Sequence, residues 1–230
     1  MSLFTYNLCL LCRQSAAATL CRGCVAQLKT LAIGTHQCRQ CALPLEANAI
    51  YCGECLTRPP AFDRIVAPFV YAHPVDYLIG RAKHHHCWRS TCALKALLAQ
   101  HVGDYYRPLP KRQWPTHVIA VPLHWRRQMS RGFNQTHALA RAAAGAIGLS
   151  LSAAALKRSR ATERQQGLNR KQRLHNLHGA FCAANLHGKR LALVDDVVTT
   201  ATTVREISKV LRRAGAAEVH IWTLARTPNS

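Results

Sequence analysis

The segment from Leu191 to Val204 constrains the fold of this 230-residue chain more than any other. Its sequence, LALVDDVVTTATTV, places four apolar residues before two adjacent acids, Asp195 and Asp196. An apolar run of this length, ended by polar residues and followed by a helical pattern, predicts a buried parallel strand of an α/β sheet. Open α/β sheets bind ligands at the carboxyl ends of their strands, where the two acids would lie.

The small residues after the acids predict a phosphate site. The turn into a helix offers free backbone N–H groups, hydroxyls and the positive end of the helix dipole. The acids can accept hydrogen bonds from a cis-diol, so the pair and the loop together suggest a sugar phosphate. An ordinary strand-turn-helix with a threonine N-cap is the alternative. The predicted loop residues are Thr199, Thr200, Ala201, Thr202 and Thr203.

This pattern resembles the 5-phosphoribosyl-1-pyrophosphate (PRPP) signature of type I phosphoribosyltransferases, which is an apolar strand, two acids and a Thr/Gly-rich loop. The resemblance implies that Mg²⁺-PRPP binds here and that Asp195 and Asp196 stabilise an oxocarbenium-like ribose during transfer. Ala201 stands where that signature usually has glycine. Its Cβ restricts positive φ and close backbone approach, so we expect a strained loop or weak PRPP binding.

Cysteines form a second constraint, because eight of the eleven fall within the first 55 residues as four Cys-x-x-Cys pairs. Two such knuckles complete a tetrahedral Cys₄ zinc site, so two structural Zn²⁺ ions are predicted. The simplest pairing is sequential, although a cross-braced arrangement or disulfides fit the same spacing. Sequential pairing places Cys9, Cys12, Cys21 and Cys24 on one ion and Cys38, Cys41, Cys52 and Cys55 on the other.

The charge and the division of the chain follow from composition. The formal net charge is +21, and two Cys₄Zn centres would lower it to about +17. This charge predicts attraction to polyanions. Paired cysteines and the lack of an apolar run long enough for a membrane span favour a cytoplasmic protein without membrane insertion. We expect a zinc module at residues 1–58 and an α/β domain at 60–230, with helices on both faces of a parallel sheet.

Further strands and helices are predicted within that domain. Strands are expected at 65–71, where Pro68 favours a sheet edge, at 117–121 and at 218–224, with Trp222 in the core. Helices are expected at 76–81, at 91–101 and from Thr136 to about Ile147. Another helix carries the stripe Val204, Ile207, Leu211 and Ala214 and ends at Gly215. Residues 83–87 include three consecutive histidines and could bind a metal, but a solvated turn is favoured there. Residues 226–230 are expected to form a polar tail.

Two more motifs identify the family that the chain resembles. A strand ending in Val-Pro is followed by arginines and by Arg-Gly-Phe-Asn-Gln135, and a second pattern falls on Thr162, Gln165, Leu168, Arg173, Asn176, Gly179, Ala180 and Phe181. With the cysteine module and the Asp-Asp loop, these motifs resemble the ComF/GntX family of phosphoribosyltransferase-like proteins. That resemblance implies a role in DNA uptake during competence or in the use of external DNA, with DNA-uptake machinery as a partner.

Basic residues complete the candidate site. Arg126, Arg127 and Arg131 follow the strand at the position expected for a pyrophosphate, whose oxygens match guanidinium forks. The tract from Lys157 to Arg173 holds seven Lys/Arg residues and one Glu. We interpret it as a basic loop that closes over PRPP or follows the backbone of single-stranded DNA, and a solvated charged loop is the alternative. Its cations are Lys157, Arg158, Arg160, Arg164, Arg170, Lys171 and Arg173.

These observations leave two functions open. One is an enzyme, a phosphoribosyltransferase whose acceptor the sequence does not identify. The other is a non-catalytic, nucleic-acid-binding protein that retains the same fold. Ala201 weakens the case for the enzyme without affecting the case for the nucleic-acid-binding protein.

Overall fold

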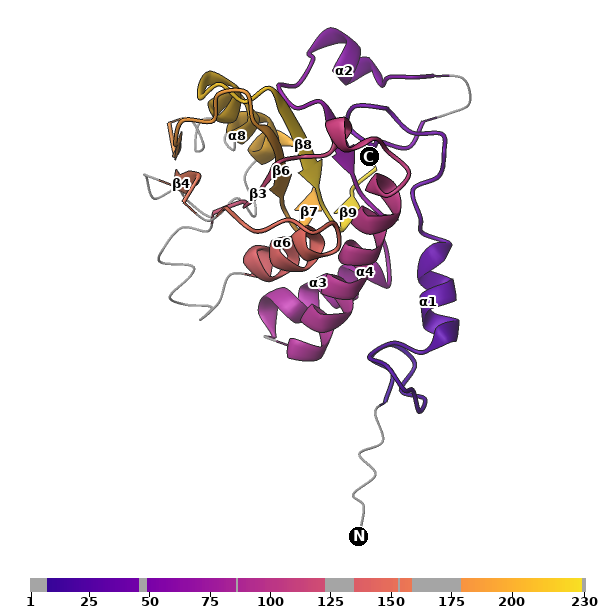
Figure 1. Cartoon of the computed structure of the whole chain (residues 1–230). Coiled ribbons are helices and arrows are strands. Elements are labelled where there is room, and N and C mark those ends of the chain that lie inside the picture. The colour runs from indigo at the N-terminus through magenta and orange to yellow at the C-terminus, as the bar shows by residue number, and fades with distance from the viewer. Residues whose placement is uncertain are drawn as a thin grey trace.

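The computed structural model describes residues 8–45, 49–85, 87–122, 135–152, 154–158 and 179–228. Its main sheet has four parallel strands in the order β1-β8-β6-β3 (Figure 1). The bounds are β1 Arg64–Val66, β8 Glu218–Trp222, β6 Arg190–Val194 and β3 His117–Ala120. All four lie where apolar runs predicted them. The sheet is therefore the parallel α/β sheet expected from the sequence.

A smaller parallel sheet continues three of these strands. Its order is β2-β9-β7, formed by Phe69–Val70, Ala225–Arg226 and Val197–Val198. The predicted strand at 65–71 is thus interrupted at Pro68, and β1 is an edge strand, as the proline suggested. β6 is likewise interrupted, at Asp195 and Asp196, before β7 begins. The acid pair consequently lies at a break in the sheet.

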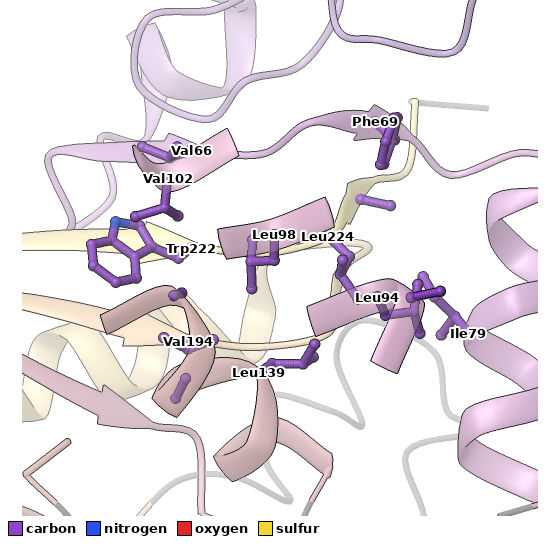
Figure 2. Packing of buried hydrophobic residues seen from close by; sticks show 14 of the residues in the cluster. Val66, Phe69, Ile79, Leu94, Leu98, Val102, Leu139, Val194, Trp222 and Leu224 are labelled. Atoms are coloured by element: carbon purple, nitrogen blue, oxygen red, sulfur yellow. The ribbon is translucent and has the colours of Figure 1, made fainter. Parts of the chain in front are cut away.

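Helices cover both faces of the main sheet. α3 (Val75–His84), α4 (Trp88–Tyr106) and α6 (Gln135–Gly145) pack on one face, and α8 (Thr202–Arg213) packs on the other. β3 shows the alternation: Val118 and Ala120 belong to the first core, whereas Ile119 and Val121 belong to the second. Figure 2 shows the first core, where Leu98, Leu139 and Trp222 lie among the labelled side chains.

The helix after the threonines follows its predicted stripe. Val204, Ile207 and Leu211 are buried, with 0 or 1% of their surface exposed, while Ala214 is the C-cap. Gly215 has φ 93°, and a Cβ there would lie 2.9 Å from the His187 Cα. Glycine is required at this position by conformation and by space.

The cysteine module packs on the α/β domain. It contains α1 (Arg22–Lys29) and α2 (Gly53–Thr57), and Leu28 of α1 is fully buried in the first core. The Ile65 N–H donates to the Gln40 carbonyl at 2.8 Å, which joins the Cys38–Cys41 knuckle to β1. The module therefore shares its buried surface with the sheet and helices.

Three local predictions were wrong. Lys83, assigned to a solvated turn, lies in the last turn of α3. Arg226, assigned to a polar tail, is only 3% exposed and ends β9. Lys157 and Arg158, assigned to a basic loop, belong to β4 (Leu156–Arg158), which pairs antiparallel with β5 (Phe181–Ala183). The remaining elements include the 3₁₀ turn η1 (Lys111–Gln113). Among the helices of the described ranges, none combines the length and apolar character that a membrane span requires.

Candidate functional site

The acid pair is held by the backbone around it. The Asp195 N–H donates to the Trp222 carbonyl at 2.9 Å, and the Asp196 carbonyl accepts from the Leu224 N–H at 3.1 Å. The Asp195 Oδ1 accepts from the Asp196 N–H at 2.9 Å, and the Asp196 Oδ1 accepts from the Val197 N–H at 2.7 Å. Both carboxylates are thereby oriented at the end of β6, where the sequence predicted them.

The environment of the pair favours a proton on Asp195. Burial, followed by the like charge of Asp196, raises the pKa of Asp195 to about 7, although the nearby Lys83 ammonium acts in the opposite direction. A carboxyl with such a pKa changes its charge near neutral pH. Ligands that need two ionised acids would therefore bind better above pH 7 than below it.

Residues 199–203, here called the threonine loop, form the turn between β7 and α8. Ala201 is the N-cap residue, with φ 56° and ψ 7°, which is a left-handed conformation. Among the described residues, the N–H groups of Thr200, Ala201 and Thr202 donate to no backbone carbonyl. The Thr200 and Thr202 hydroxyls lie 2.9 Å apart. The loop thus presents N–H donors and hydroxyls at the positive end of a helix of twelve residues.

Ala201 adopts the backbone conformation for which glycine would be the usual residue. Its side chain is 7% exposed and packs in the second core with Val204 and Ile207. The left-handed region costs a residue with a Cβ roughly 1–2 kcal/mol. The expectation of a strained loop is met at this position, and the burial of the methyl group offsets part of the cost.

Lys83 joins the acid pair from α3. Its Nζ lies 2.7 Å from the Asp196 Oδ2. Burial disfavours the charged ammonium, but the attraction of Asp196 outweighs it, so the pKa of Lys83 is raised. Lys83 is not marked as a site residue by any motif, because in the sequence it precedes three histidines and lies far from the acid pair.

A cavity of about 410 Å³ brings these elements together. Its walls include the acid pair, the whole threonine loop and Lys83. Gln135 and Thr136, at the start of α6, complete the wall, together with Arg158 of β4. Arg158, which was predicted to contact nucleic acid, lies on the same cavity as the acids. The cavity is large enough for a phosphorylated sugar.

Several predicted residues lie outside the described residues. They include the family-motif residues Thr162, Gln165, Leu168 and Asn176. The others are the pyrophosphate arginines and most of the basic tract, namely Arg126, Arg127, Arg131, Arg160, Arg164, Arg170, Lys171 and Arg173.

The cysteines form two four-sulfur clusters with the sequential pairing. In each cluster all four Sγ atoms lie within 4.8 Å of one another. The Cys12–Cys21 and Cys41–Cys52 sulfur pairs are 3.6 Å apart. Sulfurs around a tetrahedral Zn²⁺ with Zn–S bonds of about 2.3 Å lie about 3.8 Å apart, whereas a disulfide is about 2.05 Å long. The donor sets therefore fit zinc, and neither of these two sulfur pairs is at disulfide distance. The members are Cys9, Cys12, Cys21 and Cys24, and Cys38, Cys41, Cys52 and Cys55.

Thiolate formation is favoured at one cysteine of each cluster. Burial acts to raise the pKa of the Cys9 and Cys38 thiols. Backbone N–H donors act more strongly in the opposite direction, and the net result is a pKa of about 6 for Cys9 and about 7 for Cys38. Those donors include the N–H groups of Cys12 and Cys41. One sulfur of each cluster is thus held in the negative form that zinc requires. Burial and the neighbouring thiols instead raise the pKa of Cys24 and Cys41 to about 12.

Comparison with known proteins agrees with both parts of the chain. Residues 2–56 match the double zinc ribbon domain, and residues 130–230 match the phosphoribosyl transferase domain. DNA utilization protein YhgH of Escherichia coli (strain K12) is 36% identical over 228 residues, covering 96% of this chain and 97% of its own. Competence protein F of Haemophilus influenzae is 35% identical over 233 residues, covering 98% and 99%.

The chain belongs to the ComF/GntX family of phosphoribosyltransferase-like proteins. Its fold is that of a type I phosphoribosyltransferase preceded by a double zinc ribbon. Glutamine PRPP amidotransferase from B. subtilis, solved with ADP and GMP, is 24% identical with a TM-score of 0.39, and the match covers 58% of this chain and 26% of that one. Of the family motif residues, Gly179, Ala180 and Phe181 lie at the start of β5, and Gly179 has φ 68°.

Proposed function

We propose that this ComF/GntX protein binds PRPP or a closely related ribose phosphate in the cavity at the end of β6. The observation that carries the proposal is the juxtaposition of Asp195 and Asp196 with the threonine loop on one cavity of about 410 Å³. The acids supply hydrogen-bond acceptors, and the loop supplies donors and positive potential. A ligand with a diol at one end and a phosphate at the other complements both.

The chemistry of such a ligand assigns a role to each group. The carboxylates accept hydrogen bonds from the ribose 2- and 3-hydroxyls, while the loop N–H groups and hydroxyls hold the 5-phosphate. Mg²⁺ accompanies the pyrophosphate of PRPP and neutralises part of its charge. If transfer occurs, the carboxylates stabilise positive charge developing on the ribose ring.

A calorimetric ligand series tests this proposal. The ligands are PRPP with and without Mg²⁺, ribose 5-phosphate, ribose and inorganic phosphate. We expect ribose 5-phosphate to bind more tightly than ribose or phosphate alone, because only it engages both halves of the cavity. Mg²⁺ should strengthen PRPP binding. Absence of PRPP binding in both conditions, or phosphate binding as tightly as ribose 5-phosphate, would contradict the proposal.

We further propose that the protein supports DNA uptake or the use of external DNA. The support is the similarity to a DNA utilization protein and a competence protein over nearly the whole chain. Direct contact with single-stranded DNA is the second candidate function, favoured by the net charge of +21. Such binding would be electrostatic, with little sequence preference and a steep dependence on salt.

Fluorescence anisotropy with labelled single-stranded DNA tests the second function. Neutralising Arg160, Arg164 and Arg170 to glutamine should flatten the dependence of log K on log salt by about 0.7 for each DNA phosphate that the variant no longer neutralises. Neutralising Arg22 and Lys29, which are exposed on α1, is the matched control. An unchanged slope in the first variant, or equal changes in both, would show that the basic tract does not bind the DNA.

A further inference from the structure

Gln135 is the first residue of α6 and lies on the wall of the cavity that contains the acid pair. Only 5% of the residue is exposed. Both polar atoms of its side chain, Nε2 and Oε1, are buried and have no hydrogen-bond partner among the described residues. A buried amide without a partner has lost its hydrogen bonds to water and gained none in exchange, which is unfavourable for folding.

Buried polar side chains in folded proteins nearly always have partners, so a double exception requires an explanation. Among the described residues, the amide forms no hydrogen bond that stabilises α6 or its neighbours, so a structural role does not explain its burial. The cavity provides an explanation, because Gln135 lines it together with Asp195 and the threonine loop. A polar ligand bound there would lie against Gln135 as well. An amide offers a donor pair and an acceptor, and a ribose phosphate offers hydroxyls and phosphate oxygens.

We infer that Gln135 is a ligand-binding residue, whose side-chain amide forms hydrogen bonds with the ribose phosphate held by the acid pair and the threonine loop. This inference rests on the proposed function and extends the binding site to the first residue of α6. Gln135 thereby contributes specificity for a hydroxylated ligand over free phosphate. Inorganic phosphate, bound by the loop alone, does not reach it.

The same geometry predicts opposite effects of one substitution on stability and on binding. Gln135→Leu preserves the approximate volume and removes both unpartnered atoms. The melting temperature should therefore stay the same or rise by about 2–6 °C. Ribose 5-phosphate and PRPP should each bind on the order of tenfold more weakly, because the hydrogen bonds to the ligand are lost. The affinity for inorganic phosphate should not change.

The experiment measures thermal unfolding and calorimetric affinity on the full-length protein. Gln100→Leu, on the exposed side of α4, is the matched control and should alter neither affinity. Gln135→Met serves as a second variant if the leucine protein does not fold, with the same expected results. A lower melting temperature with proportionate loss of all three ligands would assign Gln135 a structural role and overturn the inference.

Failure of the inference is separable from failure of the proposed function. If the unsubstituted protein binds PRPP and ribose 5-phosphate and Gln135→Leu binds them equally well, the inference alone is refuted. If the unsubstituted protein binds neither ligand, the proposed function is refuted and the inference with it. A loss of PRPP affinity without a loss of ribose 5-phosphate affinity would place the amide on the pyrophosphate, which contradicts recognition of the ribose phosphate.

Discussion

Arg226 connects the second zinc ribbon to the threonine loop, and its replacement should disturb both. Its Nε donates to the Cys41 carbonyl at 3.1 Å. Its Nη1 donates to the Val198 carbonyl at 3.3 Å, to the Thr227 carbonyl at 2.6 Å and to the Thr199 carbonyl. The sequence suggested a polar tail here, yet the side chain is almost fully enclosed between two functional parts of the molecule.

The magnitude of the effect follows from these bonds. Among the described residues, no carboxylate forms an ion pair with Arg226, so carbonyl oxygens alone satisfy its charge. Hydrogen bonds to charged groups contribute about 1.5–3 kcal/mol each, and the desolvation of the guanidinium offsets part of that sum. A net loss of about 3 kcal/mol for Arg226→Met is expected, which corresponds to about 6–12 °C in melting temperature for a chain of this size.

Thermal unfolding and ribose 5-phosphate binding are the assays. Arg226→Met should lower the melting temperature and weaken binding, because the loop loses its support at Thr199. Arg226→Lys retains the charge but not the guanidinium fork. Its melting temperature and affinity should therefore lie between those of the unsubstituted protein and of Arg226→Met. Arg213→Met, at the exposed end of α8, is the control. A melting temperature within about 2 °C of the unsubstituted protein, with unchanged affinity, would refute the reasoning.

Three further predictions concern zinc, the acid pair and the loop. Elemental analysis should find about two zinc ions per chain. Chelation should lower the melting temperature of the whole protein, because Leu28 of the cysteine module is part of the first core. Oxidised thiols or the absence of zinc would contradict this prediction. Because ionised Asp195 is needed and its pKa is about 7, ribose 5-phosphate affinity should fall as pH falls through 7. Lys83→Met removes the ammonium charge that lowers the pKa of Asp195, so the loss of affinity should occur at a higher pH. An unchanged pH profile would show that Lys83 does not influence the protonation of Asp195. Ala201→Gly should change the melting temperature by less than about 2 °C. Glycine relieves the strain of the left-handed conformation, but it also makes the unfolded chain more flexible and removes a buried methyl group, so the effects balance. A shift well beyond that range would show that one of these effects dominates.

The sheet and the position of the acid pair could be predicted because they depend on local patterns. An apolar run that ends in Asp195 and Asp196 has few structural interpretations besides a buried strand. The sequential pairing of the cysteines was the simplest reading of spacing alone, but only the grouping of the sulfurs distinguishes it from a cross-braced arrangement. The family motifs supported the same fold from separate segments.

Lys83 and Arg226 could not be placed from sequence because their partners are distant in the chain. The position of Gln135 on the cavity likewise depends on how α6 packs. Lys83 follows a helical pattern and precedes three histidines, and only the packing of α3 brings it to Asp196. Arg226 lies near the end of the chain, where basic residues are usually solvated. Ala201 was noted as a departure from glycine, but its φ of 56° could only be seen in the structure.

The most direct test of the central claim is the affinity of the acid-pair variants for ribose 5-phosphate. Calorimetry would compare the unsubstituted protein with Asp195→Asn, Asp196→Asn and the exposed control Asp76→Asn. Each site variant should bind roughly tenfold to a hundredfold more weakly, because a charge-assisted hydrogen bond to a ribose hydroxyl is weakened. The control should bind normally. Equal affinity in all four proteins would contradict a ribose-phosphate site at the end of β6.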